Sequence, residues 1–231
     1  MADQDVPKLD GPHLDGPRWG PASKGKPRQI VFLLHGLGAD GNDLIDLAPR
    51  WSQAVPDALF ISPHAPTPYQ DAPFGRQWFA LTDRDPARME AGVRAAFPAV
   101  DAMIARECAA AGLPETNVML MGFSQGAMTA LFCGLRRAIA PAAILAYSGI
   151  LLAPASLGAE LRGRPPVLLV HGEIDEVVPV AGSRNAEREL RDAGVPVETV
   201  YSPRLGHGID DAGLAAGSLF LQRAAAGLPP G

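Results

Sequence analysis

The segment GFSQG at residues 122–126 places Ser124 two positions from a glycine on either side. An apolar strand-like run, Val118 to Met121, precedes it, and a helix-like run, Ala127 to Ile139, follows it. A serine at such a strand-to-helix turn forms the arrangement called a nucleophile elbow, in which the turn holds the serine in a strained backbone conformation. Glycines at the crowded neighbouring positions leave room for that turn. The spacing therefore predicts that Ser124 is a nucleophile.

A serine hydroxyl is a poor nucleophile at neutral pH unless a base within hydrogen-bond reach takes its proton, and a third group must orient that base. In sheets with this elbow, the partners follow the serine in the chain order acid, then histidine. Two of the five histidines come after Ser124. His171 ends a predicted strand and is expected to shape that strand end. His207 lies in a loop between two glycines before the last predicted helix, so we predict that His207 is the base.

The loop HGEIDEVVP, residues 171–179, offers three carboxylates for the acid. Asp175 is predicted, because the two valines that follow it would bury the loop and make an unpaired carboxylate there costly. A buried carboxylate that holds the imidazole in one tautomer is what the mechanism needs. Glu173 is expected to lie too close to the strand, and Glu176 to point in another direction. For these two, solvated surface charges remain an alternative interpretation.

An oxyanion formed during attack by Ser124 needs donors that are fixed before the reaction, and backbone N–H groups meet that need. One donor is expected from Gln125, which follows the serine and opens a helix whose dipole favours negative charge. The second is expected from Leu37 in the glycine-rich loop HGLGADG, residues 35–41. Such a loop can also bind a dinucleotide, and residues 36–41 match the short GxGxxG spacing, which is a weak signal by itself, but the loop lacks a Walker-type lysine.

The elements that must position these residues follow from the hydrophobic pattern. From Gln29 onward, mostly continuous apolar runs alternate with helix-like segments, as expected of a parallel sheet covered on both faces. The predicted strands are Gln29 to His35, Ala58 to Ser62, Val118 to Met121, Ala142 to Ser148, Val167 to His171 and Val197 to Tyr201. The predicted helices are Asp43 to Ala54, Pro86 to Ala111 with a break or kink at Pro98, Ala127 to Ile139, Gly182 to Ala193 and Ile209 to Ala226. The alternation predicts a mostly parallel, doubly wound α/β sheet in one domain, with ligands beyond the carboxyl ends of its strands.

Composition and charge argue against several other classes of protein. Hydrophobic residues make up 47% of the chain, and no apolar run approaches the roughly 18 to 20 residues that span a bilayer. The N-terminus lacks the apolar core of a signal peptide, so a cytoplasmic location is expected. A net charge of −5 without a cluster of cations longer than Arg136-Arg137 argues against nucleic acid as a partner. Cys108 and Cys133, without CxxC spacing, are predicted to be buried, reduced thiols.

The first 27 residues repeat the unit LDGP, at residues 9–12 and 14–17, in a stretch rich in proline and glycine. They are predicted to form an extended tail before a domain of residues 28–231. Two alternatives stay open for this tail. It is either mobile, or an arm that packs on the domain or on a partner subunit with Trp19 as its anchor.

Four blocks of the sequence, HGLGADGNDL, GFSQGAM, HGEIDEVVP and GHGID, together resemble the carboxylesterase and acyl-protein thioesterase family of the α/β-hydrolases, which includes small bacterial carboxylesterases. The stretches ISPHAP at residues 61–66 and RQWF at residues 76–79 are similar to the segment that this family has between its second strand and the next helix. The resemblance runs from about Gln29 to about Gln222. It implies an α/β-hydrolase fold without a large cap.

The resemblance also implies hydrolysis of esters or thioesters of short to medium acyl chains, without a metal or cofactor and often by homodimers. Position by position, the family's triad falls on Ser124, Asp175 and His207, and its oxyanion donors on Leu37 and Gln125. A carboxylesterase is the first expectation, and an acyl-protein thioesterase or lysophospholipase is the alternative. Two rivals stay open, namely an acyltransferase with the same triad and a non-catalytic binding protein on a hydrolase scaffold.

The segment from Pro63 to Pro86 is long for a connector and rich in proline and aromatic residues. We expect it to lie over the serine and to line an acyl pocket through Trp78 and Phe79, together with Leu37 and Val177. Replacement of Trp78 by alanine would then change the preference for acyl length more than the stability. The alternative is a loop that only covers the core.

Overall fold

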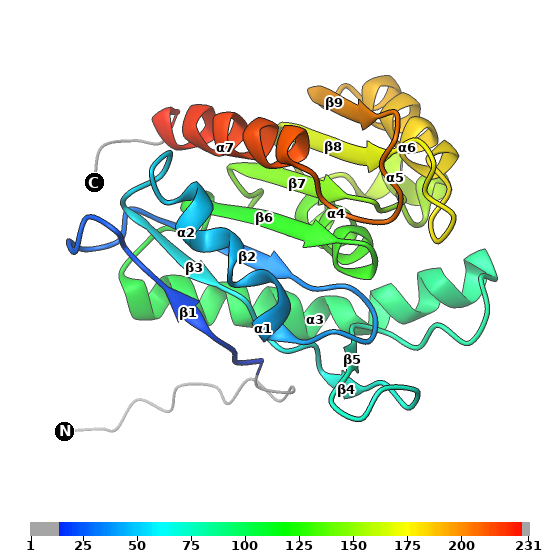
Figure 1. Ribbon diagram of the computed structural model, residues 1–231, viewed down its shortest axis with the longest axis horizontal. Coiled ribbons are helices and arrows are strands. Elements are labelled where there is room, and N and C mark those ends of the chain that lie inside the picture. The colour runs from blue at the N-terminus through cyan, green and yellow to red at the C-terminus, as the bar shows by residue number, and fades with distance from the viewer. Residues whose placement is uncertain (1–13, 228–231) are drawn as a thin grey trace.

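A seven-stranded sheet runs through the centre of the computed structural model, which describes residues 14–227 (Figure 1). Its parallel strands are β2 (Gln29–Leu34), β3 (Ala58–Ile61), β6 (Val118–Phe123), β7 (Ala143–Tyr147), β8 (Val167–Gly172) and β9 (Val197–Ser202). The strand order is β1-β3-β2-β6-β7-β8-β9, in which the short edge strand β1 (Arg18–Trp19) runs antiparallel to β3. The prediction of a mostly parallel α/β sheet in one domain is confirmed.

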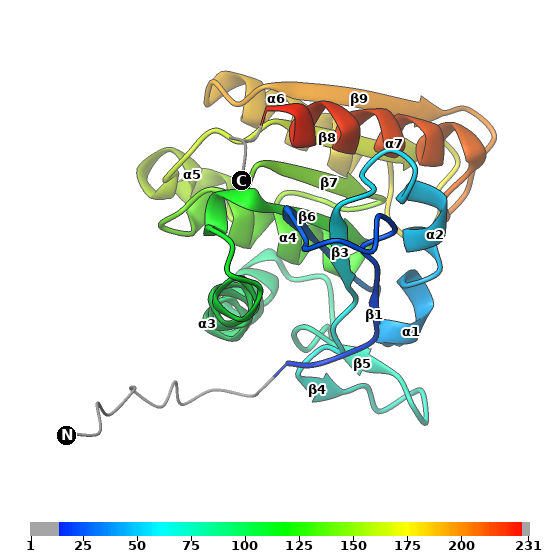
Figure 2. The same ribbon diagram turned by 90° about the vertical axis from the view of Figure 1, so that its left-hand side faces the viewer.

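Helices cover both faces of this sheet (Figure 2). One face carries α1 (Gly41–Leu44), α2 (Leu47–Trp51) and α7 (Asp211–Ala226). The other carries α3 (Pro86–Ala111), α4 (Gln125–Arg136), α5 (Pro154–Glu160) and α6 (Ala181–Asp192). Outside these layers, the described chain forms the 3₁₀ helix η1 (Glu115–Asn117) and a hairpin of β4 (Thr67–Pro68) and β5 (Arg76–Gln77). The hydrophobic pattern predicted neither this hairpin nor β1 and α5, because each is too short to show a periodicity.

Two expectations about the helices differ from the structure. The single helix predicted from residue 43 to residue 54 is instead the pair α1 and α2, which are four and five residues long. The helix α3 is 26 residues long and continues through Pro98, so this proline does not end it. Pro98 lies on the exposed side of α3, while Val93 and Val100 on either side of it are buried in the core. Packing of these neighbours outweighs the one backbone hydrogen bond that the proline removes.

Two hydrophobic clusters, one on each face, explain why the strands are continuous apolar runs. In β2, Ile30, Phe32 and Leu34 belong to the cluster that includes buried residues of α3, α4 and α6. Val31 and Leu33 belong to the opposite cluster, which includes residues of α2 and α7. Successive side chains of a strand point to opposite faces of a sheet. Because both faces of β2 are covered, every one of these positions has to be apolar.

The described part of the N-terminal segment, residues 14–27, packs on the domain as an arm. Leu14 is buried in the core, and the guanidinium of Arg18 lies 2.5 Å from the Glu107 carboxylate. The ring of Trp19 lies 6.0 Å from that of Phe60 on β3. Of the two alternatives left open for this segment, the described residues adopt the arm. Residues 1–13 of the predicted tail lie outside the described residues.

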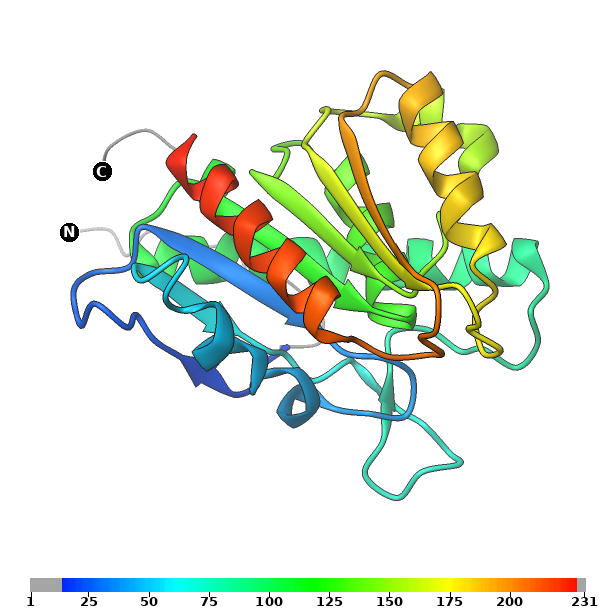
Figure 3. The same ribbon diagram turned by 45° about the horizontal axis from the view of Figure 1, so that its top comes forward.

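The strand order reverses between β2 and β6, which are neighbours in the sheet although β3 lies between them in the chain. In doubly wound sheets a crevice opens at that point, outside the carboxyl ends of the strands. Figure 3 shows the loops after β2, β8 and β9 at this edge of the sheet. The segments with the predicted site residues follow these strands and β6.

Candidate active site

Ser124 occupies the turn between β6 and α4 in a backbone conformation that is strained for a residue with a side chain. Its φ and ψ angles are 54° and −116°. A Cβ atom at Gly122 would overlap the carbonyl of Gly126, and one at Gly126 would overlap the carbonyl of Leu34 on β2. The two glycines therefore let the turn close and let α4 begin directly against the sheet. The Ser124 N–H donates to the carbonyl of Tyr147 at 2.8 Å, which fixes the turn from the other side.

A cavity of about 790 Å³ lies beside this turn, a size within the usual range of small-molecule sites. Ser124, Gln125, Leu37 and His207 all line it. Most of its other lining is apolar and includes Leu81, Met89, Met128, Ile150, Leu151 and Leu152. The charged side chains that line it are Asp43, Arg84 and Glu90. The structure thus brings three segments that are remote in sequence to one largely apolar cavity.

Asp175 and His207 form a hydrogen-bonded pair. Nδ1 of His207 lies 2.7 Å from Oδ2 of Asp175, whose side chain is fully buried. The backbone N–H groups of Val177 and Val178 donate to Oδ1 of Asp175 at 2.9 and 2.8 Å. Burial alone would raise the pKa of the Asp175 carboxyl, but the bonds from His207 and Val178 outweigh burial and hold that pKa below its usual value. Asp175 is therefore ionised at neutral pH and accepts a hydrogen bond from Nδ1–H of His207.

Backbone contacts hold the loop of Asp175 against the loop of His207. The N–H of Glu173 donates to the carbonyl of Ser202 at 2.9 Å, and the N–H of Ile174 donates to that of Leu205 at 3.2 Å. The His207 ring lies 4.8 Å from the ring of Phe123, the residue that precedes Ser124. The loops of Asp175 and His207 are therefore joined to each other and placed beside the turn of Ser124.

His171 is a second histidine beside the predicted acid. It is fully buried, and its Nε2 lies 2.7 Å from the carbonyl of Val178 and 3.2 Å from Oδ2 of Asp175. Its Nδ1 lies 2.6 Å from the hydroxyl of Ser183 on α6. Burial lowers the pKa of His171, so the ring is neutral and its Nε2–H donates to the acid loop. It shapes the end of β8, in keeping with the role expected from its position, and it also contacts the acid.

The loop after β2 brings the N–H of Leu37 to the same cavity. A Cβ atom at Gly36 would lie 3.5 Å from Cβ of Ser124, so the peptide between Gly36 and Leu37 runs beside the serine. Within residues 14–227, the N–H groups of Leu37 and Gln125 donate to no other protein group. Two unpaired N–H groups beside one hydroxyl can donate hydrogen bonds to a negatively charged oxygen.

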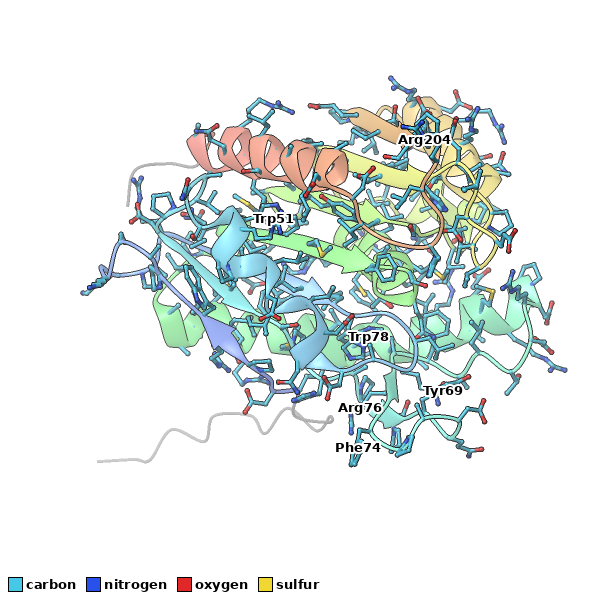
Figure 4. The ribbon with its side chains drawn as sticks, in the orientation of Figure 1. Trp51, Tyr69, Phe74, Arg76, Trp78 and Arg204 are labelled. Carbon is cyan, nitrogen blue, oxygen red and sulfur yellow. The ribbon has the colours of Figure 1, made fainter. Side chains whose placement is uncertain are left out.

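Trp78 and Phe79 lie elsewhere than expected. They are only 2% and 4% exposed and do not line the cavity. The indole N–H of Trp78 donates to the carbonyl of His35 at 2.9 Å, which turns the ring into the protein. Figure 4 shows Trp78 inside the molecule and Phe74 at the tip of the β4–β5 hairpin. The hypothesis that both aromatic residues line an acyl pocket is therefore corrected, whereas Val177 does line the cavity.

The apolar lining itself was missed, because it comes from α3, α4 and the connection before α5. Met89, Met128 and Leu152 are its deeply buried members. The helices of Met89 and Met128 were predicted, but nothing in the local spacing separates a residue that faces a cavity from one that faces the core. Of the two other carboxylates in the acid loop, Glu173 pairs with Arg184 at the surface, at 2.6 Å.

No group of three or more His, Cys, Asp or Glu side chains among residues 14–227 is arranged to hold a metal ion. Within the same range, none of the helices has both the length and the apolar character needed to cross a membrane.

His35 supports a prediction about stability. It is fully buried at the end of β2, and burial lowers its pKa from 6.5 to about 4. Between these pH values the unfolded chain binds a proton that the folded chain does not, so the free energy of unfolding falls as the pH falls. The loss that His35 contributes by pH 4 is at most about 3 kcal/mol. Urea unfolding at pH 7.5 and 4.5 should show a smaller difference for His35→Asn than for the unmodified protein. Equal differences in the free energy of unfolding for the two proteins would contradict the assignment of this pH dependence to His35.

The chain is similar to proteins of one family. Residues 21–224 match the family described as phospholipase/carboxylesterase. The crystal structure of esterase PE8 is similar, with a TM-score of 0.87 and 42% sequence identity over 91% of this chain and 99% of that chain. A probable inactive carboxylesterase of Oryza sativa subsp. japonica is 30% identical over 82% of this chain and 82% of its own length. Acyl-protein thioesterase 1 of Neurospora crassa is 29% identical over 77% of this chain and 79% of its own length.

Proposed function

The chain belongs to the phospholipase/carboxylesterase family, and we propose that it is a serine carboxylesterase that hydrolyses esters of short to medium acyl chains. One observation carries this proposal. His207, which is paired with Asp175 at 2.7 Å, lines the same cavity as Ser124, a serine held in a strained elbow. An imidazole whose Nδ1–H is held by a buried carboxylate has its Nε2 lone pair free to accept a proton.

Acyl transfer then proceeds in two steps. His207 Nε2 takes the proton of the Ser124 hydroxyl as Oγ attacks the carbonyl carbon of the ester. The resulting imidazolium, stabilised by ionised Asp175, returns the proton to the leaving alkoxide, and the acyl group stays on Oγ. Water repeats the sequence: His207 takes a proton from water as it attacks the acyl carbon, and returns it to Oγ as the carboxylic acid leaves.

The N–H groups of Leu37 and Gln125 stabilise the oxyanion in both steps. They are fixed by the loop after β2 and by the first turn of α4, so they need no reorganisation as charge develops. The positive end of the α4 dipole adds to this stabilisation. Neither donor requires a proton transfer.

The apolar cavity would hold the acyl chain, which gives a prediction about specificity. Ile150 lines the cavity and is only partly buried, so a larger side chain there would occupy the space of a long acyl group. Ile150→Trp is expected to lower kcat/KM for octanoate and decanoate esters about 10-fold or more, and for acetate esters less than about 3-fold. The matched control is Ile139→Trp, at an exposed isoleucine that does not line the cavity. An equal loss for all chain lengths would contradict the placement of the acyl chain.

The proposed function is tested by covalent labelling and a substrate panel. An alkyl fluorophosphonate should label the protein at Ser124, which peptide mass spectrometry locates. The panel consists of p-nitrophenyl esters and matched acyl thioesters of increasing chain length, each followed by steady-state kinetics. Absence of both labelling and turnover across the panel would refute the proposal.

Two alternatives have a specific observation behind them. Similarity to a protein named acyl-protein thioesterase 1 keeps thioesters as an alternative substrate class, and the ratio of thioester to ester kcat/KM decides between them. Similarity to a protein named probable inactive carboxylesterase keeps a non-catalytic binding protein as the second alternative. The homodimer and the cytoplasmic location stay predictions.

A further inference from the structure

A chain of buried hydrogen bonds connects Gln125 with the loop of Leu37, and both of these residues line the cavity. It starts at the side chain of Gln125, whose Oε1 accepts from the Trp78 N–H at 2.9 Å and whose Nε2 donates to the carbonyl of Phe79 at 2.7 Å. The indole N–H of Trp78 then donates to the carbonyl of His35 at 2.9 Å. Gln125, Trp78 and His35 are all at most 2% exposed, so water does not compete for these bonds. Figure 4 shows Trp78 within this interior.

The imidazole of His35 extends this series of hydrogen bonds to the loop after β2. The N–H of Ala65 donates to Nε2 of His35 at 3.0 Å, which places the ring proton of the neutral histidine on Nδ1. Nδ1 lies 2.8 Å from the carbonyl oxygen of Gly36, to which it therefore donates. Burial lowers the pKa of His35 to about 4, so the ring keeps this neutral form at working pH. The same carbonyl accepts a longer bond, of 3.3 Å, from the N–H of Ala39.

The hydrogen bond from His35 to the carbonyl of Gly36 also affects the N–H of Leu37, because the two groups belong to the same peptide unit. The carbonyl of Gly36 and the N–H of Leu37 belong to one planar peptide and point in opposite directions. A donor that fixes the carbonyl therefore also fixes the direction of the N–H. It also polarises the peptide, which makes the N–H a stronger donor in a buried site.

We infer that His35, Trp78 and the side chain of Gln125 form a brace that holds both oxyanion donors in one geometry. His35 and Trp78 are positioning residues in this arrangement, since neither lines the cavity. The inference rests on the proposed function, because it presumes that Leu37 and Gln125 receive the oxyanion. It also gives Trp78 a role in place of the acyl contact expected from the sequence.

Two substitutions at His35 separate positioning from stability. In His35→Asn, the amide nitrogen takes the place of Nδ1 and donates to Gly36, while the N–H of Ala65 loses its acceptor. In His35→Gln, the amide oxygen takes the place of Nε2 and accepts from Ala65, while Gly36 loses its short bond. Both variants thus lose one buried hydrogen bond, and only the second releases the peptide that carries the Leu37 N–H.

The expected result is a split between kcat and stability. His35→Gln should lower kcat about 10- to 100-fold, somewhat less than removal of a whole oxyanion donor, with KM changed less than about 3-fold. His35→Asn should keep kcat within about 3-fold of the unmodified enzyme, although its melting temperature should fall at least as far as that of His35→Gln. An alkyl trifluoromethyl ketone, which forms an oxyanion on the serine, should bind His35→Gln more weakly by a factor similar to the loss of kcat/KM.

Trp78→Phe provides a second variant if either His35 variant fails to fold. It keeps an aromatic ring in the core and removes the N–H that reaches the carbonyl of His35. It should lower kcat with little change in KM, and its effect should be less than additive with that of His35→Gln.

The brace and the proposed function can fail separately. The brace alone would be overturned if the unmodified enzyme turned over esters but the loss of kcat in each variant simply matched its loss of melting temperature. An unmodified protein that neither turns over esters nor reacts with the fluorophosphonate would overturn both. Full kcat in both His35→Gln and Trp78→Phe would also overturn the brace.

Discussion

Replacement of Ser124 by alanine is expected to lower kcat for ester hydrolysis by about 10⁴-fold or more. The hydroxyl forms the covalent bond to the acyl group, and no other hydroxyl or thiol of the described chain lines the cavity. What remains is binding and the oxyanion donors. The measurement is the initial rate with p-nitrophenyl butyrate at saturating substrate.

The fold should survive this change, which makes the result interpretable. Alanine has to adopt the same φ of 54° as Ser124, so the backbone strain is the same in both proteins. The melting temperature is therefore expected to change little. Turnover near that of the unmodified enzyme, in a folded variant that no longer binds the fluorophosphonate covalently, would remove Ser124 from the mechanism.

Replacement of Asp175 by asparagine is expected to lower kcat by about 10⁴-fold at neutral pH, as found when the carboxylate of a serine-protease triad becomes an amide. The reason lies in the donors around this side chain. The N–H groups of Val177 and Val178 require an acceptor at one position, so the amide oxygen has to lie there. The amide NH₂ then faces Nδ1 of His207. Nδ1 becomes an acceptor, and the ring proton moves to Nε2, where it blocks proton transfer from Ser124.

The acid loop offers a matched control for this substitution. Glu173→Gln also turns a carboxylate into an amide, but at a surface pair with Arg184 that lies outside the cavity. It should leave kcat within about 2-fold of the unmodified enzyme, since surface pairs contribute little. If Glu173→Gln and Asp175→Asn lowered kcat equally, the assignment of the acid would be wrong. Steady-state kinetics of both variants with one ester, beside their melting temperatures, decide the question.

Most of the fold could be predicted because the pattern that specifies it is local. The apolar runs within β2, β6 and β8 are covered on both faces, so consecutive positions of each run are apolar. The single helix predicted at residues 43–54 was wrong because its apolar residues follow helical spacing over two short helices. The sequence could not decide between an arm and a mobile tail for residues 14–27, since β1 pairs with β3 over only two residues.

The sequence by itself determined the chemistry that the chain can offer. It placed Ser124 between glycines at a strand-to-helix turn, and His207 and Asp175 on loops after later strands, because backbone conformation and strand ends leave a local mark on residue type. Only the tertiary structure decided which side chains face the cavity. Trp78 turned inward to His35, while Met128 and Leu152 faced the space beside Ser124. The direction of an apolar side chain depends on partners distant in sequence, and no local pattern records which of them it meets.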